Sequence, residues 1–395
     1  MSDTISSKTA DQQTAETALV IVGRSEISLW SLKLDERIRR QFAKTAAFTE
    51  LDVDNVGGHG GDVLLVRGDC VIDQPLVGVM QVRRNFLLLE QAGQPASVLA
   101  AHVSPIDVAS ILKLMRGEPA ELNDRLSALA PHEIDAGFWK ALRKRETPYA
   151  MRVTKETQVA VEWRMFMGTY KGATDIVTKH VWPRPAFHVT RWLAQRGVTP
   201  NMVTSVAAVA TVLAFFLFLR GAFLWGLAAA WLMTFLDTVD GKLARTTLTS
   251  SKWGDVFDHG IDLVHPPFWY VAWALGLGAA GFVWSHSLFW WTTGLILGGY
   301  VLQRVMEGIA IKWLGLEIHI WRPIDTLFRQ VTARRNSNLV LLTIFATLGR
   351  PDLGLLAVAA WTVACLVLHG LQLVQAFAAK KVAGPPGLQS WMRRP

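Results

Sequence analysis

Residues 236–262 read LDTVDGKLARTTLTSSKWGDVFDHGID, and apolar runs flank this stretch on both sides. Asp237 and Asp240 are three residues apart, and Asp258 and Asp262 are four apart, so each pair projects from one face of a helix. A carboxylate at the centre of a membrane helix costs roughly 2.5–3.5 kcal/mol on insertion scales, so four of them need a compensating partner. Two antiparallel helices joined at residues 246–253 would bring both pairs together around a divalent cation.

The residue types around the aspartates favour a magnesium or manganese ion and a phosphate ligand. Carboxylate oxygens suit Mg²⁺ or Mn²⁺, and Mg²⁺ is commonly shared between protein carboxylates and substrate phosphates. Gly241 and Gly254 allow close approach of a ligand, and Arg245 offers a planar cation to a phosphate. The pattern predicts metal-assisted chemistry on a phosphate anhydride. The alternative, a solvated acidic loop between two membrane helices, would not require this fixed order of residues.

The order D-x-x-D-G-x-x-A-R-x8-G-x3-D-x3-D resembles the signature of the CDP-alcohol phosphotransferase (CDP-alcohol phosphatidyltransferase) family without a departure. The resemblance implies transfer of a phosphatidyl or phospho-alcohol group from a CDP-alcohol to a hydroxyl acceptor, with release of CMP. It implies that Asp237, Asp240 and Asp258 bind Mg²⁺ or Mn²⁺. Asp262 would be the general base and would also touch a metal. The implied CDP-binding residues are Asn201, Thr204, Asp237, Gly241, Ala244, Arg245 and Gly254.

For Asn201, Thr204 and His259, which lie in or near the signature, the sequence also allows an interpretation without a role in binding or catalysis. Thr199 and Pro200 are typical of a helix start, and as a plain capping motif this segment needs no ligand at Asn201 or Thr204. His259 falls on a variable slot of the family pattern, so a bystander role is favoured over metal ligand or base.

Basic residues near the fifth apolar segment are the candidates for binding the acceptor. In family members that use a phosphorylated acceptor, basic residues in this neighbourhood bind its phosphate, which here implicates Arg329, Arg334 and Arg335. A cluster of positive charge facing the cytoplasm is the alternative. Arg304 and Glu307 either border the acceptor or neutralise each other at i, i+3.

The second half of the chain predicts an all-α bundle of six transmembrane helices. Its apolar segments are residues 203–219, 222–243, 256–279, 285–311, 337–349 and 353–378. The basic connections follow the second, fourth and sixth segments. The positive-inside rule then puts both termini and the aspartates on the cytoplasmic side of the cytoplasmic (inner) membrane. Although the net charge is +8, the basic residues flank apolar segments, which predicts a lipid bilayer as partner and no nucleic acid.

The first half predicts a soluble α/β domain. Residues 18–22, 63–66 and 98–103 are strand candidates, residues 31–45 have helical periodicity, and the alternation favours a parallel sheet with crossovers. Residues 63–73 resemble the strand-Gly-Asp segment of sugar-1-phosphate nucleotidyltransferases. The fusion resembles bifunctional inositol-1-phosphate cytidylyltransferase/di-inositol phosphate synthase proteins, which implies an inositol- or polyol-phosphate acceptor. Residues 22–27 lack the family's glycine-rich loop, so we expect a degenerate domain with a scaffolding or regulatory role, with cytidylyl transfer as the alternative.

These inferences divide the chain into five parts. We expect a disordered tail at 1–16, the degenerate nucleotidyltransferase-like domain at 17–160, an amphipathic juxtamembrane segment at 161–200, the phosphotransferase domain at 201–380 and a cytoplasmic tail at 381–395. The donor would be a CDP-alcohol such as CDP-diacylglycerol or a CDP-polyol. Whether the acceptor is phosphorylated and whether the chain forms a homodimer stay open. A cation transporter or channel and an inactive membrane scaffold are the rival functions.

Overall fold

The computed structural model describes residues 17–45, 47–135, 137–139, 142–250, 252–384 and 387–393, with only the backbone of residues 252–253 and 255–259. The predicted tail at 1–16 lies outside the described residues. The chain divides into two compact units, each treated separately below. Unit 1 comprises Met1–Ala136 and Thr147–Val161, and unit 2 comprises Gly137–Glu146 and Glu162–Pro395.

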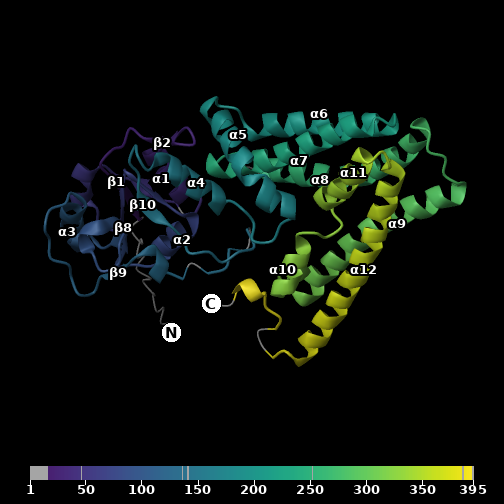
Figure 1. Ribbon diagram of the computed structural model, residues 1–395. Helices are drawn as coiled ribbons and strands as arrows, with labels where there is room; N and C mark the ends of the chain where they lie inside the picture. The colour runs from purple at the N-terminus through teal and green to yellow at the C-terminus, as the bar shows by residue number, and fades with distance from the viewer. Residues whose placement is uncertain are drawn as a thin grey trace, which may run out of the picture. The chain divides into compact units, whose positions relative to one another are not determined.

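Unit 1 is built on a six-stranded sheet with the order β4-β1-β5-β8-β7-β9 (Figure 1). The sheet strands are β1 (Ala18–Val22), β4 (Thr49–Glu50), β5 (Val63–Arg67), β7 (Phe86–Leu89), β8 (Val98–Val103) and β9 (Ser127–Leu129). Two small sheets pair β2 (Ser28–Leu29) with β3 (Leu32–Lys33) and β6 (Cys70–Ile72) with β10 (Ala150–Arg152). The three strands that the sequence predicts are therefore present, and the α/β class is confirmed.

The prediction of a parallel sheet is wrong, because β8 runs antiparallel to both of its neighbours, β5 and β7. β1 pairs in parallel with β4 and β5, as expected. The connection from β7 to β8 covers only residues 90–97, which is too short for the helical crossover that a parallel pair requires. The chain therefore turns back after β7 and inserts β8 between β5 and β7.

Helices cover both faces of this sheet. The unit 1 helices are α1 (Leu34–Ala43), α2 (Gln74–Val82) and α3 (Pro105–Met115). Phe42 of α1 and Met80 of α2 share a hydrophobic cluster with Leu64 of β5, whereas Ile111 of α3 shares one with Leu65. Because successive strand residues point to opposite faces, β5 is buried on both sides, as its apolar run predicts.

Unit 2 is helical, and each of the six predicted apolar segments lies in a helix (Figure 1). These helices are α6 (Pro200–Leu219), α7 (Phe223–Thr246), α8 (Lys252–Ala279), α9 (His286–Ile309), α11 (Arg335–Thr347) and α12 (Pro351–Val382). Among the described residues, four helical segments are long and apolar enough to cross a membrane: 200–219, 223–246, 286–314 and 351–382. Unit 2 therefore has the character of a multi-pass membrane protein.

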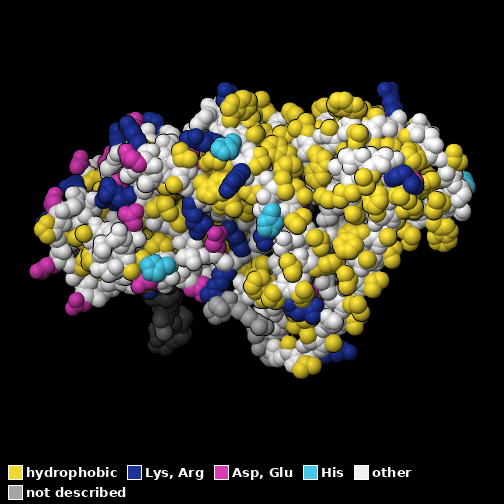
Figure 2. All heavy atoms as spheres, viewed as in Figure 1, with side chains coloured by type: hydrophobic (Ala, Val, Ile, Leu, Met, Phe, Trp, Pro, Cys, Tyr) yellow, Lys and Arg dark blue, Asp and Glu magenta, His cyan; other side chains and the backbone are white. Residues whose placement is uncertain are grey.

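The surface of unit 2 agrees with this assignment. On the face drawn in Figure 2, hydrophobic side chains cover much of the helical region, whereas acidic side chains gather over unit 1. On α6, the side chains of Val206, Val209, Leu213 and Phe216 are more than half exposed and recur every three or four residues. Such an exposed apolar stripe is stable against lipid but not against water.

The interior of the bundle is closely packed around large aromatic side chains. Trp269 and Trp273 of α8 are buried, and the Trp269 indole donates a hydrogen bond to the Thr211 carbonyl of α6 at 3.0 Å. A Cβ atom at Gly276 would lie 1.8 Å from the carbonyl oxygen of Phe218. Helices α6 and α8 therefore approach so closely at this point that only glycine fits.

The aromatic residues of the juxtamembrane segment lie in two different environments. The segment contains α4 (Gln158–Gly168), a π-helical turn (Val177–Val181) and α5 (Pro183–Gln195). Phe187 is buried with its ring 5.1 Å from that of Trp163. Trp192 is half exposed, and the Arg196 guanidinium lies 4.0 Å from the centre of its ring. One face of α5 is thus packed, and the other presents an aromatic and a cationic side chain.

Candidate functional site

The site lies where α7 ends and α8 begins, which is the hairpin that the aspartate spacing predicts. Asp237 and Asp240 lie two to three turns before the end of α7 at Thr246, and Asp262 lies in the third turn of α8. The side chain of Asp258 lies outside the described residues, and so does that of His259. In the part of the chain whose side chains are described, no group of three or more metal-ligating residues is assembled.

Arg335, the first residue of α11, joins the two aspartate helices. Its Nη2 atom donates to Asp237 Oδ2 at 2.5 Å, and its Nη1 atom donates to Asp262 Oδ1. The two carboxylates therefore converge on one cation, as expected for side chains that would otherwise repel each other. The sequence assigns Arg335 to the acceptor phosphate, whereas this structure pairs it with the aspartates.

Asp240 is held by a different contact. Thr204 of α6 donates its hydroxyl hydrogen to Asp240 Oδ2 at 2.5 Å, so the start of α6 contacts the signature helix. Asp240 is 3% exposed, and its other oxygen, Oδ1, is buried with no hydrogen-bond partner among the described residues. A buried carboxylate oxygen without a donor is costly and is a favourable position for a bound cation.

The helix that carries Asp262 contains two consecutive prolines, Pro266 and Pro267, in its interior. Pro267 has no N–H group to donate to the Leu263 carbonyl one turn earlier. Tyr300 of α9 compensates by donating its hydroxyl hydrogen to the Leu263 carbonyl at 2.8 Å. This bond ties α9 to the turn of α8 that immediately follows Asp262. His265 is buried, and its ring nitrogen Nδ1 contacts the Ile261 carbonyl at 2.7 Å.

The other signature residues form the surroundings of the aspartates. A Cβ atom at Gly241 would lie 2.9 Å from Arg245 Nη2, so the glycine leaves room for the arginine side chain. Ala244 and Gly254 are partly buried. Thr199 caps α6 by accepting the Met202 N–H at 3.4 Å, as predicted, and Asn201 is exposed in the first turn.

Sequence reasoning missed the environment of Lys242, which follows Gly241 in the signature. Lys242 is 3% exposed, and its ammonium nitrogen lies 3.0 Å from the centre of the Tyr170 ring. The Phe166 ring centre is 5.9 Å from the same nitrogen. A buried lysine is stabilised by such aromatic faces. Little in the sequence indicated this environment, because Lys242 occupies a position of the signature that specifies no residue.

The remaining acceptor candidates lie in a second polar cluster. Arg334 donates to Glu307 Oε1, and Arg304 Nη1 donates to Glu307 Oε2 at 3.1 Å. His319 Nε2 contacts Glu307 Oε1 at 3.0 Å, and burial lowers the pKa of His319 to about 3, so the imidazole is neutral. The ion pair between Arg304 and Glu307, one of the two alternatives considered for these residues, is present, and His319 is a member that the sequence did not suggest.

Arg329 of α10 (Pro323–Arg329) differs from its neighbours. Its Nε and Nη1 atoms are buried and have no hydrogen-bond partner among the described residues. Burial, and then the positive charge of Arg334, lower the pKa of Arg329. Because guanidinium groups remain protonated, the lowered pKa means that this cation is under-compensated and would bind an anion favourably.

Comparison with known proteins shows which family this helical region is similar to. Residues 197–333 match the family model of CDP-alcohol phosphatidyltransferase, which confirms the resemblance drawn from the aspartate signature for this part of the chain. This family is one of transferases, and the match covers α6 to α9 together with the acceptor candidate Arg329.

The similar curated proteins are all named as synthases of an inositol phosphate lipid. The chain is 34% identical over 119 residues to the phosphatidylinositol phosphate synthase of Mycobacteroides abscessus, covering 30% of this chain and 50% of that protein. It is 30% identical over 150 residues to the phosphatidylinositol phosphate synthase of Streptomyces avermitilis, covering 37% of this chain and 59% of that protein. It is 39% identical over 80 residues to the archaetidylinositol phosphate synthase of Pyrococcus horikoshii, covering 20% of this chain and 42% of that protein. The chain thus spans about half the length of the curated relatives it matches.

Proposed function

We propose that the chain is an integral membrane phosphotransferase that moves a phosphatidyl or phospho-alcohol group from a CDP-alcohol to a hydroxyl acceptor, with release of CMP. One observation carries the proposal: Asp237 of α7 and Asp262 of α8 converge on the same cationic group, Arg335, beside the buried Asp240. The family match over residues 197–333 supports the chemistry. A cation pathway would not require the Gly-Ala-Arg order beside these carboxylates.

The residues present suit a divalent metal ion. Asp240 Oδ1 has no hydrogen-bond partner in the described part of the chain, and Asp237 and Asp262 need a positive charge between them; both are features of a cation site. Asp237, Asp240, Asp258 and Asp262 would hold Mg²⁺ or Mn²⁺ through hard oxygen donors. When bound, the ion would neutralise charge on the pyrophosphate and on the departing CMP.

The protein side chains have separate roles in the proposed reaction. Asp262 takes the proton of the acceptor hydroxyl, and the acceptor oxygen attacks the phosphorus that carries the donor alcohol. The bond from this phosphorus to the bridging pyrophosphate oxygen breaks, and CMP leaves with the electron pair. Asn201, Thr204, Asp237, Gly241, Ala244, Arg245 and Gly254 surround the CDP group. Thr204 fixes the orientation of Asp240 by its hydrogen bond.

The proposed acceptor is an inositol phosphate, and the proposed donor is a CDP-linked lipid such as CDP-diacylglycerol. The names of the similar proteins support this choice, and so does the under-compensated guanidinium of Arg329. Arg334 and Arg335 belong to the same basic segment. Arg335 could serve the acceptor phosphate only after leaving Asp237 and Asp262.

We further propose that α6, α7, α8, α9, α11 and α12 form a six-helix transmembrane bundle with the aspartates and both termini on the cytoplasmic side. The basic residues that follow α7, α9 and α12 support this orientation. Donors activated with cytidine nucleotides would then reach the aspartates from the compartment in which they are made.

The function is tested by turnover in lipid nanodiscs with CDP-diacylglycerol radiolabelled in its cytidine. We expect CMP release only with Mg²⁺ or Mn²⁺ and with inositol 1-phosphate, and much less with unphosphorylated inositol. Asp262→Asn should reduce turnover by about 10² or more while nucleotide binding is retained. Asp352→Asn is the matched control, because Asp352 is a carboxylate at the start of α12 that pairs with Arg350. Full activity of Asp262→Asn would remove it from the base role, and CMP release without metal would contradict the proposed site.

A further inference from the structure

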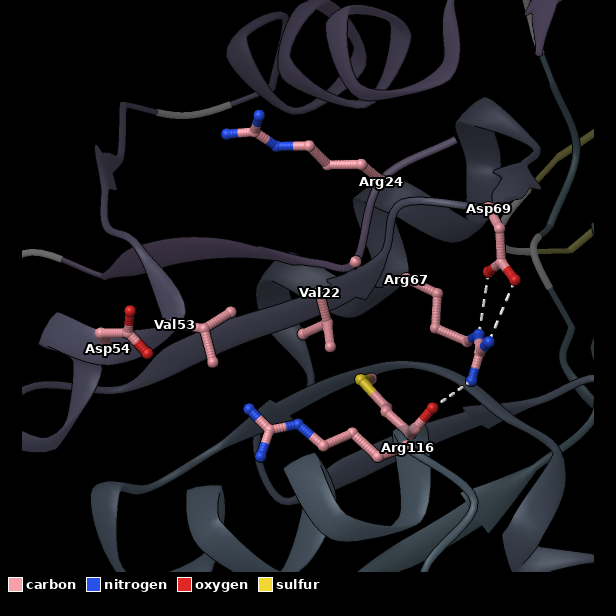
Figure 3. Close-up of a pocket in the computed structure, with 9 residues that line it drawn as sticks. Val22, Arg24, Val53, Asp54, Arg67, Asp69 and Arg116 are labelled. Carbon is pink, nitrogen blue, oxygen red and sulfur yellow. Dashed lines mark hydrogen bonds and ion pairs between the residues drawn. The ribbon is translucent and has the colours of Figure 1, made fainter. Parts of the chain in front are cut away.

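Unit 1 contains a cavity of about 440 Å³ at the carboxyl ends of two neighbouring parallel strands, β1 and β5 (Figure 3). In sheets of this kind, ligands bind beyond the carboxyl ends of the strands. The volume lies within the range of roughly 300–1,000 Å³ that is typical of small-molecule sites. The cavity includes the segment Val22-Gly23-Arg24, where the sequence lacks a glycine-rich phosphate loop.

The two loops that form the cavity are locked against each other. The Gly68 N–H group donates to the Val22 carbonyl at 2.9 Å, and a Cβ atom at Gly68 would lie 2.4 Å from the Gly23 carbonyl oxygen. Gly23 itself has a φ of +79°, a conformation that side chains disfavour. The backbone that leads into Arg24 and the backbone that leads into Asp69 are therefore fixed relative to each other.

Asp69 lines this cavity but is already neutralised. Arg67 donates two parallel hydrogen bonds to it, Nε to Oδ1 at 2.9 Å and Nη2 to Oδ2 at 3.0 Å. Arg152 donates two more to Oδ2, from Nη2 at 2.8 Å and from Nε at 3.1 Å. The remaining terminal nitrogen of Arg67 donates to the Met115 carbonyl. Burial opposes ionisation of Asp69, yet these two guanidinium groups hold its pKa below the usual value. A carboxylate that is saturated in this way has no charge left for a metal ion, so Asp69 acts as a fixed wall of the cavity.

Two other charged residues that line the cavity, both arginines, are not neutralised as Asp69 is. Arg24 and Arg116 are exposed, and within the described part of the chain neither side chain has a hydrogen bond or an ion pair. Figure 3 shows them extending on either side of the apolar side chain of Val22, without a dashed line to any other residue drawn. Besides the Arg67–Asp69 pair, Asp54 is the other charged residue of the lining, so the cavity carries one acidic side chain and two cationic side chains that have no partner among the described residues.

We propose that this cavity binds a phosphate monoester of a small organic molecule through Arg24 and Arg116, without a metal ion. Guanidinium groups recognise phosphate oxygens with two parallel hydrogen bonds, and two of them suit the double charge of a monoester. The apolar side chains of Val22 and Val53 offer a surface for the organic part of the ligand. This site goes beyond the proposed function, because it lies within unit 1 and takes part in no group transfer.

The proposal is tested on the full chain in nanodiscs of neutral lipid, by hydrogen–deuterium exchange with EDTA present. The probes are CMP and glycerol 3-phosphate, with glycerol as the dephosphorylated control. We expect both phosphate esters, but not glycerol, to protect the peptides that contain residues 22–24 and 115–116. The readout is local to unit 1 and does not depend on turnover, so it is independent of the reaction proposed for unit 2.

Variants make the test specific. Arg24→Gln combined with Arg116→Gln should weaken the protection by about tenfold or more, because charge-assisted hydrogen bonds are lost. Both arginines are exposed and unpaired, so the thermal unfolding midpoint should not change. Arg40→Gln is the control, because Arg40 pairs with Glu36 on α1 and does not line the cavity. Protection that appears only with Mg²⁺, no protection by either ester, or an unchanged affinity in the double variant would each overturn the proposal.

Discussion

Arg335 Nη2 lies 2.5 Å from Asp237 Oδ2 and so connects the first residue of α11 to a carboxylate of α7 that is 98 positions earlier in the sequence. The same guanidinium donates to Asp262 of α8. A guanidinium and a divalent cation are alternative partners for these carboxylates, because both neutralise them through the same oxygens. We therefore expect Arg335 to compete with a divalent metal ion for these carboxylates.

The first prediction follows from this competition. Arg335→Gln should tighten Mn²⁺ binding by about tenfold in the absence of substrates, because the metal no longer displaces charge-assisted hydrogen bonds. Calorimetry on the detergent-solubilised protein measures the affinity. Arg350→Gln, which removes an arginine paired with Asp352 at the start of α12, should leave the affinity unchanged. Weaker Mn²⁺ binding in Arg335→Gln would mean that Arg335 supports the metal and does not compete with it.

The second prediction concerns Thr204, which donates to the buried Asp240. Thr204→Val removes this donor and should lower the free energy of unfolding by about 1–3 kcal/mol, whereas Thr204→Ser should preserve it. Thr211→Val is the control, because Thr211 lies in the same helix and its hydroxyl donates to the Ala207 carbonyl of that helix. Thermal unfolding of the metal-free protein gives the comparison. Equal effects at the two threonines would show that the contact with Asp240 contributes nothing specific.

The third prediction is a pH dependence in unit 1. Burial raises the pKa of Asp69, but Arg67 and Arg152 outweigh this effect and lower it below the model-peptide value of about 3.9. A lowered folded pKa stabilises the protein above the unfolded pKa, and this stabilisation is lost as the pH falls through the folded pKa. The stability difference between wild type and Asp69→Asn should therefore be constant from about pH 7 to pH 5 and shrink below about pH 4.

Hydrogen exchange of the β1 and β5 peptides measures this difference across the pH range. Arg67→Gln supplies the control, because it removes the larger of the two ion-pair partners of Asp69. The difference in stability between Arg67→Gln and the double variant Arg67→Gln/Asp69→Asn should vary less with pH. A difference between wild type and Asp69→Asn that does not change between pH 5 and pH 2 would contradict the assignment.

The fourth prediction concerns the packing of α6 against α8. Gly276→Ala places a methyl group 1.8 Å from the Phe218 carbonyl oxygen, so the helices must separate. We expect a loss of about 1–3 kcal/mol or more in the free energy of unfolding. Gly278→Ala lies two residues further along the same helix, where no atom is within 4 Å of the new Cβ, and should be tolerated. Thermal unfolding in detergent compares the two variants, and equal midpoints would contradict the close approach.

Local patterns in the sequence were sufficient for much of the fold. The apolar runs at residues 18–22, 63–66 and 98–103 are strands, and the apolar segments of the second half are helices. The direction of β8 was not predictable from its own residues, because it depends on β7, a four-residue strand that the sequence analysis did not identify. Register and direction are set by the neighbouring strands and by the length of the connection between them.

The candidate site was predictable to a similar extent. The spacing of the aspartates predicted a shared face, because this relation is local to two helices. The partner of Asp237 and Asp262 was not predictable, since Arg335 is 98 and 73 residues away from them. Asp69 shows the same limit, because its second partner, Arg152, is 83 residues further along the chain. Contacts between distant segments leave no spacing pattern in one sequence.

The length of α11 has a consequence for access to the aspartates. Its 13 residues rise to about 20 Å, roughly 10 Å less than the hydrocarbon thickness of a bilayer. In the proposed six-helix bundle, with Arg350 at one boundary of the hydrocarbon layer, the opposite end of α11, which begins with Arg335, would lie beneath the other boundary. The aspartates that Arg335 contacts would then lie below the headgroup layer, so a lipid donor would react without leaving the membrane, but its phosphate would have to enter the bilayer to meet them.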